Sequence, residues 1–403
     1  MSQLATIIKA KAKLAALKIV VTVVPAPRPI VLLGADAALR LCDTINHIGA
    51  KRVLVVTDAV LVKLGVIEPL LQRLAALNID AKVFSGVTPD PTVTVVEQGL
   101  AMLHATGCDA VLAVGGGSSI DAAKVIALSA SNHKTPQQLI GILKGKQPAL
   151  PFFVVPTTAG TGSEVTIGAV ISDPATHQKN LVIDPKIVPL ATAIDPTIMQ
   201  GMPPHITADT GVDALTHALE AWMSEFANPE TDYYASAAVR MIFQQLPTAY
   251  QQGGDLIARE ALGLAAHYAG LALNQAGLGY VHGLAHQLGA YYGVPHGRAN
   301  AVVLAHILAF NQKASEDRLA ELARRVGLVT GQMTDAAAAA SLLHNVQALL
   351  QQLNIPTQLA TIQASDFAPM IEKAFTEVHG TYAVPRYMTA EQARQILTAI
   401  KHG

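Results

Sequence analysis

Histidines gather in one region of this 403-residue chain, where five of the 14 fall between residues 267 and 306. Upstream of that region, Asp213 and His217 stand four residues apart on a helical pattern, so their side chains would lie on one helix face, one turn apart. His282 and His286 repeat this spacing. Carboxylates and imidazoles arranged in this way are typical ligands of a transition metal. The spacing therefore predicts a metal site.

Four of these side chains would form the set that suits one ion: Asp213, His217, His282 and His296. The last of them follows a proline and precedes a glycine, where we expect a loop to meet a helix. One carboxylate and three imidazoles suit Fe(II) or Zn(II), allow Mn or Co, and suit Ca or Mg poorly. A single histidine on an apolar face is more often a core residue, but two pairs at helical spacing favour ligands. His286 would then lie near the ion unbound, and such an imidazole can relay a proton.

A second candidate site follows the apolar run Ala110 to Val114. The next residues read GGGSSIDAAK (115–124), and they would turn a buried strand into a helix that begins at about Ser119. Free N–H groups at the start of that helix would suit a pyrophosphate. The alternative is a tight turn whose glycines serve packing only, since the sequence is not the GxGxxG fingerprint.

Two further features fit a nucleotide. Asp58 ends the run RVLVVT, where its carboxylate could bond the hydroxyls of an adenosine ribose and repel a 2′-phosphate, which would favour NAD over NADP. Taken alone, Asp58 is as readily explained as a helix N-cap. The loop PTTAGTGSEVT (156–166) places five hydroxyls and two glycines after the run FFVV, and it would either line a cofactor cleft or form an ordinary hydroxyl-rich cap.

The elements that would position these residues change in character along the chain. From about Pro29 to Pro196, β-branched runs alternate with helical patterns such as 61–77 and 93–106, which is typical of a mostly parallel α/β sheet. The expected strands are Arg52–Thr57, Asp80–Phe84, Ala110–Val114, Phe152–Val155 and Leu190–Ile194. After Pro196 the pattern is helical throughout. We therefore expect an N-terminal extension (1–28), an α/β nucleotide-binding domain (29–200) and an all-α metal-binding domain (201–403), with a cleft between the last two.

Composition narrows the class of protein. The 28 Lys and Arg against 29 Asp and Glu give a net charge of −1 with no long basic run, which argues against a nucleic-acid partner. The most apolar stretch, 14–25, is too short to span a membrane. Only Cys42 and Cys108 occur, without metal or disulfide spacing, which suits a reducing cytoplasm. Since only 14% of residues are charged, we expect a homodimer or higher homo-oligomer.

Taken together, the motifs GGGSSIDAAK, PTTAGTGSEVT, DPTIMQGMPP, GVDALTHALEAW and HGLAHQLGAYYGVPHG resemble the iron-containing (group III) alcohol dehydrogenases, which share the fold of dehydroquinate synthase. The resemblance extends from about Pro29 over most of the chain. It implies a nucleotide-binding α/β domain, a helical domain, and a metal between them held by one Asp and three His, which here are Asp213, His217, His282 and His296. His286 matches the family's unligated histidine beside the nicotinamide.

The resemblance also implies cofactor contacts. Those carried over to this chain are Asp58, Asp90, Gly116, Gly117, Ser118, Asp121, Thr157, Thr158, Val170 and Lys179. Two features depart from the family pattern. The chain has roughly 20 more N-terminal residues than the family core, and Val384-Pro385-Arg386 stands where many members read Asn-Pro-Arg. The second departure lies in the expected wall of the substrate cleft and therefore bears on which substrate is bound.

The implied activity is reversible oxidation of a primary alcohol or diol to an aldehyde, with hydride transfer to NAD and Lewis-acid assistance from Fe(II) or Zn(II). His286 would relay the proton. Two alternatives remain at this point. One is an NAD- and metal-dependent lyase of the dehydroquinate synthase type, although the basic residues that a phosphorylated substrate requires are few near the histidines. The other is a non-catalytic, NAD-binding oligomer.

Overall fold

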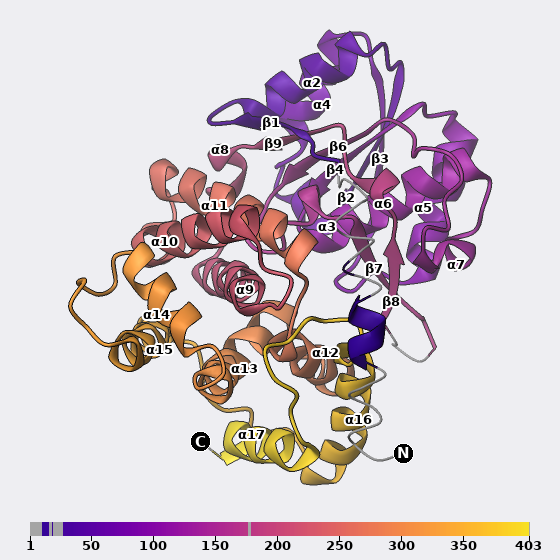
Figure 1. The fold of residues 1–403 in the computed structure, drawn as a ribbon. Helices are drawn as coiled ribbons and strands as arrows, with labels where there is room; N and C mark the ends of the chain where they lie inside the picture. The colour runs from indigo at the N-terminus through magenta and orange to yellow at the C-terminus, as the bar shows by residue number, and fades with distance from the viewer. Residues whose placement is uncertain (1–9, 16–17, 19–26, 176–178, 403) are drawn as a thin grey trace. The chain divides into compact units, whose positions relative to one another are not determined.

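The computed structural model describes residues 10–15, 18, 27–175 and 179–402. Figure 1 gives the order of the elements. The chain divides into two compact units, one of Ala26–Met202 with Gly253–His267, and one of Met1–Pro25, Pro203–Gln252 and Tyr268–Gly403. Most of the expected N-terminal extension lies outside the described residues, of which 10–15 are helical.

The first unit is built on a six-stranded sheet in the order β1-β9-β6-β4-β2-β3. Every neighbouring pair in this sheet is parallel, which confirms the predicted α/β class. The strands are β1 (Ile30–Leu33), β2 (Arg52–Asp58), β3 (Asp80–Val87), β4 (Ala110–Gly115), β6 (Phe152–Pro156) and β9 (Ala191–Ile194). All five predicted strands are present. The sequence missed β1, a four-residue strand at the sheet edge whose apolar side chains are largely exposed.

Successive side chains of each strand point to opposite faces of the sheet, so the apolar strands form a hydrophobic core on each face. Leu54 and Val56 of β2 pack on one face with helices α5 (Val93–Thr106) and α6 (Gly117–Asn132). Val53 and Val55 pack on the other face with α2 (Ala37–His47) and α4 (Glu68–Ala76). Because both faces are covered, the strands read as continuous apolar runs, as expected for a parallel sheet.

A second, three-stranded sheet in the order β5-β8-β7 was not predicted. It consists of β5 (Gly141–Ile142), β8 (Lys179–Ile183) and β7 (Gly168–Ser172), and β7 pairs with β8 antiparallel. Buried side chains of β7 and β8 join the same core as α6. The small sheet thus covers part of the helix that follows the glycine-rich turn.

Both predicted helical segments are helical in the structure, but one of them is divided into two helices. The pattern 93–106 forms α5, as expected, and in the structure Thr92 caps its start and Gly107 ends it. The pattern 61–77 instead forms two helices, α3 (Ala59–Lys63) and α4. The division falls at Gly65, whose φ of +70° is the left-handed conformation that ends a helix, and Pro69 then stands in the first turn of α4.

The second unit is helical, as predicted after Pro196. It contains α9 (Pro204–Met223), α10 (Pro229–Gln251), α12 (Tyr280–Tyr292), α13 (His296–Asn311), α14 (Glu316–Arg325), α15 (Asp335–Gln352), α16 (Phe367–Val378) and α17 (Ala390–His402). Helix α9 packs against α10 and α13, and α12 packs against α13 and α16. Among the helices of the described residues, none is long and apolar enough to cross a membrane.

Helix α11 (Leu256–Ala276) contributes to both units. The sequence assigned all of 201–403 to one domain, whereas Gly253–His267 groups with the α/β unit. The fully buried guanidinium of Arg259 explains this grouping, because it donates to the carbonyls of Gly253 (2.9 Å) and Met202 (3.0 Å). A burial of this kind requires hydrogen-bond acceptors, and the α/β unit supplies them.

Candidate metal centre

Three helices of the second unit carry the four predicted metal ligands. Asp213 and His217 lie one turn apart on α9 and are 2% and 4% exposed. His282 lies in the first turn of α12 and is 1% exposed. His296 is the first residue of α13, which agrees with the expected meeting of loop and helix. Packing of α9, α12 and α13 brings these side chains together.

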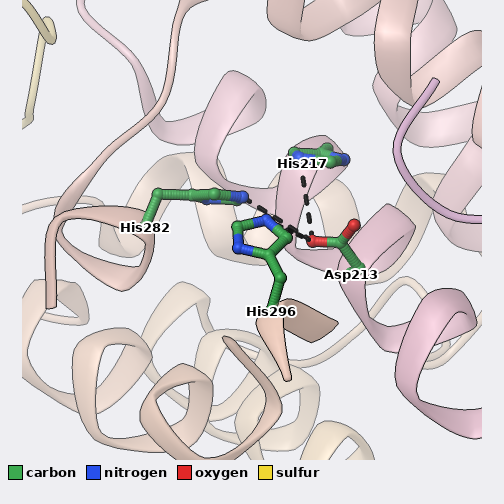
Figure 2. Close-up of side chains that lie close together, drawn as sticks. All are labelled: Asp213, His217, His282 and His296. Carbon is green, nitrogen blue, oxygen red and sulfur yellow. Dashed lines mark ion pairs between the residues drawn. The ribbon is translucent and has the colours of Figure 1, made fainter. Parts of the chain in front are cut away.

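The four side chains converge on the carboxylate, as Figure 2 shows. Oδ1 of Asp213 lies 3.8 Å from Nε2 of His217, 3.7 Å from Nε2 of His282 and 3.5 Å from Nε2 of His296. The four ligand atoms all lie within 4.8 Å of one another. One oxygen and three nitrogens at this separation fit a tetrahedrally coordinated transition metal.

The electrostatics of the cluster agree with binding of a cation. Burial acts to raise the pKa of Asp213, but the surrounding imidazoles hold it well below the usual value, so the carboxylate is ionised. Burial acts to lower the pKa of His282, yet the carboxylates of Glu220 and Asp213 raise it to about 9. The buried charge of the cluster is therefore negative at its centre, and positive charge is stabilised around it.

The sequence missed Glu220, which holds His282, one of the predicted ligands. Its Oε2 accepts from Nδ1 of His282 (2.6 Å), and its Oε1 accepts from the backbone N–H of Val281 (2.7 Å). The carboxylate therefore leaves Nε2 of His282 to face the other ligand atoms. A carboxylate behind a ligating imidazole is a common support of metal sites. Its signal was available, because Glu220 lies seven residues after Asp213 and three after His217 on one helix face.

Asn300 is a second residue that the sequence missed. Its side chain is fully buried, and Nδ2 donates to Oδ1 of Asp213 (2.7 Å). The same nitrogen lies 3.1 Å from Nε2 of His282 and 3.2 Å from Nε2 of His296. Asn300 stands one turn after His296 on α13, which is the helical spacing that could have revealed it. The contact with Asp213 is the one compatible with a bound ion, because each imidazole has a single lone pair at Nε2 and would use it for the metal.

A close approach of two helices explains the glycine after His296. A Cβ atom at Gly297 would lie 2.4 Å from the backbone oxygen of Asp209 on α9. Only glycine permits this approach of α13 to α9. The approach sets the distance between His296 and Asp213.

His286 lies outside the four-residue cluster but contacts it. It stands one turn after His282 on α12, and its ring stacks on that of His296 with centroids 5.3 Å apart. Nδ1 of His286 lies 2.7 Å from Oε1 of Glu377 on α16. The histidine is thus near the predicted ligands and held by a separate carboxylate.

The glycine-rich turn lies in the first unit, at the carboxyl end of β4. Helix α6 begins at Gly117, two residues earlier than predicted, and Gly116 before it is extended. A Cβ atom at Gly117 would lie 2.7 Å from Cγ2 of Thr161. Gly116 caps the helix with no side-chain hydrogen bond, so the first N–H groups are not used by a capping side chain. This arrangement suits a phosphate, and half-buried Ser118 lies in the first turn.

Asp58 caps a helix, as the alternative interpretation expected. Oδ1 accepts from the backbone N–H groups of Val60 (2.8 Å) and Leu61 (2.9 Å) at the start of α3. The cap does not conflict with a ribose contact, because both bonds use the same oxygen of a half-buried carboxylate.

Asp121 ties α6 to its neighbours. Its carboxylate accepts from Oγ of Ser163 (2.5 Å) and from the backbone N–H of Val170 on β7 (2.8 Å). Lys124, one turn further on, is fully buried and donates to Ser163 and to the carbonyls of Thr166 and Gly168. Burial lowers the pKa of Lys124 to about 8. These contacts indicate that Asp121 holds the loop 156–166 in place.

The remaining predicted cofactor residues lie in this loop, at the start of β8 and in the turn before α5. Thr157 is 7% exposed, and Thr158 is half-buried next to Gly116. Lys179 and Asp90 form an ion pair of 3.0 Å. Asp90 adopts a φ of +51°, which places its exposed side chain in a turn.

A phosphate-type helix start and a carboxylate-imidazole cluster are features of enzymes that use a dinucleotide and a metal. Comparison of the sequence with models of known protein families identifies one family within this class of enzymes. Residues 28–196 match iron-containing alcohol dehydrogenase, and residues 207–401 match the C-terminal part of the Fe-containing alcohol dehydrogenase family. The chain belongs to the iron-containing alcohol dehydrogenase family.

Individual relatives agree. The chain is 37% identical over 371 residues to an NAD-dependent methanol dehydrogenase of Bacillus methanolicus, covering 92% of this chain and 97% of that protein. It is 39% identical over 348 residues to a 1,3-propanediol dehydrogenase of Citrobacter freundii, covering 85% and 90%. Among solved structures, a 1,3-propanediol oxidoreductase superposes with a TM-score of 0.90 at 36% identity, covering 93% of this chain and 98% of the other. The protein is an NAD-linked alcohol dehydrogenase with the dehydroquinate synthase-like fold.

Proposed function

We propose that this dehydrogenase oxidises small primary alcohols or diols reversibly to aldehydes. The observation that carries the proposal is the cluster of one carboxylate and three imidazoles in the helical unit. The names of its relatives, a methanol dehydrogenase and a 1,3-propanediol dehydrogenase, support a small primary alcohol as substrate. The matched family does not favour the lyase or the non-catalytic alternative.

The cluster fits the metal that the family name implies. Asp213, His217, His282 and His296 would hold the ion, which we propose to be Fe(II), with Zn(II) as the alternative. When bound, such an ion supplies Lewis-acid chemistry that lowers the pKa of an alcohol towards neutrality. The single carboxylate gives the donor set a negative charge, and Glu220 orients His282 within it.

Residues of the α/β unit would hold NAD. We propose that the N–H groups at the start of α6, with Gly116, Gly117 and Ser118, bind the pyrophosphate. Asp58 would accept hydrogen bonds from the ribose hydroxyls. Thr157, Thr158 and Lys179 would line the rest of the cofactor, while Asp121, Val170 and Asp90 hold the surrounding loops through the bonds described above.

His286 would take the proton in the oxidation. The O–H bond of the alcohol would break as an N–H bond forms at the imidazole. When bound, NAD would supply the acceptor for the hydride that leaves the carbon, so that the alcohol loses one proton and one hydride.

We propose that the enzyme acts in the cytoplasm as a homodimer or higher homo-oligomer, a proposal that the 14% charged fraction and the two buried free cysteines support.

A metal-reconstitution assay tests the function. The protein is stripped of metal, reloaded anaerobically with Fe(II) or Zn(II), and mixed with NAD and a panel of primary alcohols and diols while NADH is followed by absorbance. We expect turnover only after reloading. The variant His282→Ala should lose metal and turnover together, whereas His306→Ala, on the same unit but outside the cluster, should keep both. Turnover that persists without metal would overturn the proposal.

A further inference from the structure

His286 and Glu377 form an ion pair between α12 and α16. Nδ1 of the imidazole lies 2.7 Å from Oε1 of the carboxylate, and the two side chains are 16% and 23% exposed. The pair is 91 residues apart in sequence, so packing of α12 on α16 creates it. None of the four predicted ligands bonds to Glu377 among the contacts described. This carboxylate is therefore a separate support, distinct from Glu220.

Tyr382 fixes the carboxylate from the other side. Its hydroxyl donates to the same Oε1 of Glu377 at 2.8 Å, and the tyrosine is 7% exposed. Burial and the neighbouring carboxylate raise the pKa of Tyr382 well above 10, so the hydroxyl keeps its proton. Burial acts to raise the pKa of Glu377, but His286 and Tyr382 lower it. The carboxylate therefore remains ionised, and it can only accept hydrogen bonds.

This geometry decides the state of the histidine. An ionised carboxylate cannot donate, so Nδ1 of His286 must carry the proton that they share. In the neutral ring, Nε2 then presents a lone pair. The stacked contact with His296 and the edge contact with His282, whose centroid lies 5.8 Å away, restrict rotation of the ring. His286 is thus held as a base at one defined atom.

We propose that Glu377 is a positioning residue for proton transfer: through its hydrogen bond to Nδ1 it holds the His286 ring in one orientation and in the Nδ1–H tautomer, so that Nε2 is the atom available to the alcohol. The hydrogen bond from Tyr382 holds the Glu377 carboxylate in place. The inference rests on the proposed function, because NAD must accept the hydride that leaves as the proton is transferred. The step balances, since one O–H bond breaks as one N–H bond forms, and the proton later passes to solvent.

A double-mutant cycle tests the dependence on His286. Glu377→Gln keeps the size of the side chain and an acceptor oxygen but removes the charge. We expect it to lower kcat about 10- to 100-fold, a part of the roughly 10²- to 10⁴-fold that general base catalysis supplies, with KM changed less than about twofold. In a His286→Ala background, Glu377→Gln should have an effect below about twofold, because the residue acts only through the imidazole.

Matched variants separate this role from stability. Glu372→Gln changes an exposed carboxylate on the same helix, and it should leave kcat unchanged. Tyr382→Phe should lower kcat less than Glu377→Gln does, because one of two donors to the carboxylate is lost. Metal content and circular dichroism should match the wild type in every variant. An equal loss from Glu377→Gln with and without His286, or no loss with it, would overturn the proposal.

A measurement without turnover tests the same geometry. In ¹⁵N-histidine-labelled protein loaded with Zn(II), long-range ¹H–¹⁵N spectra distinguish the two tautomers, and the His286 signals are those absent from His286→Ala. We expect the Nδ1–H form in the wild type and a shift towards a tautomer mixture in Glu377→Ala. An Nε2–H form in the wild type would overturn the inference. If the wild type oxidised no alcohol, the proposed function would fail, and the tautomer would still decide whether Glu377 sets the protonation of His286.

Discussion

Replacing Glu220 with Gln should weaken metal binding about tenfold. The carboxylate bonds Nδ1 of His282 at 2.6 Å and the backbone N–H of Val281 at 2.7 Å. Gln has one acceptor oxygen for these two donors and lacks the charge. A hydrogen bond to a charged group contributes about 1.5–3 kcal/mol, roughly twice a neutral one, so the substitution should remove about 1–1.5 kcal/mol. This loss corresponds to about a tenfold rise in the dissociation constant.

The assay is competition between metal-free protein and a chromophoric chelator for Zn(II). Glu164→Gln is the matched control, because Glu164 is also buried and pairs with a histidine, His267, at 3.2 Å in the α/β unit. It should leave the dissociation constant unchanged. Unfolding of both metal-free variants by urea would establish that each is folded. An affinity of Glu220→Gln within twofold of the wild type would refute the reasoning, because the orienting carboxylate would then add nothing to the site.

Three further outcomes follow from contacts described above. Asn300→Ala removes the amide that bonds Asp213, and it should also weaken Zn(II) binding about tenfold in the chelator assay; unchanged affinity would mean that the amide does not support the site. Asp58→Asn keeps a side chain that caps α3 but loses the charge, so the ratio of kcat/KM for NAD over NADP should fall about tenfold, and a constant ratio would exclude a ribose contact. Lys124→Met leaves its acceptors at Ser163 and Gly168 unpaired, and urea unfolding should show a loss of about 3–5 kcal/mol; a loss below about 1 kcal/mol would contradict this reasoning.

The sheet was predictable because its strands are short, continuously apolar and buried on both faces. The runs that form β2, β4 and β6 stand between glycine- or polar-rich segments, so both their type and their order along the chain could be inferred. Strand β1 was not recognised, since four residues, three of them exposed, after a proline-rich segment carry no such pattern. The small antiparallel sheet was missed because its two longer strands, β7 (GAVIS) and β8 (KNLVI), mix apolar residues with glycine or polar residues and form no continuous apolar run.

The candidate ligands were predictable because helical spacing is local. Asp213 and His217 share a helix face by sequence alone, and the same rule would have included Glu220 and, from His296, Asn300. Glu377 gave no such signal. It meets His286 across 91 residues, through packing of two helices that no local pattern specifies.

All four proposed metal ligands and their supports, Glu220 and Asn300, belong to one compact unit, whereas the glycine-rich turn belongs to the other. A bound ligand stabilises only the structure that binds it. Loss of the ion would therefore lower the opening free energy of the helical unit. In a cell short of metal, proteolytic attack on this enzyme should begin in its helical unit, so that metal supply would govern its abundance as well as its activity.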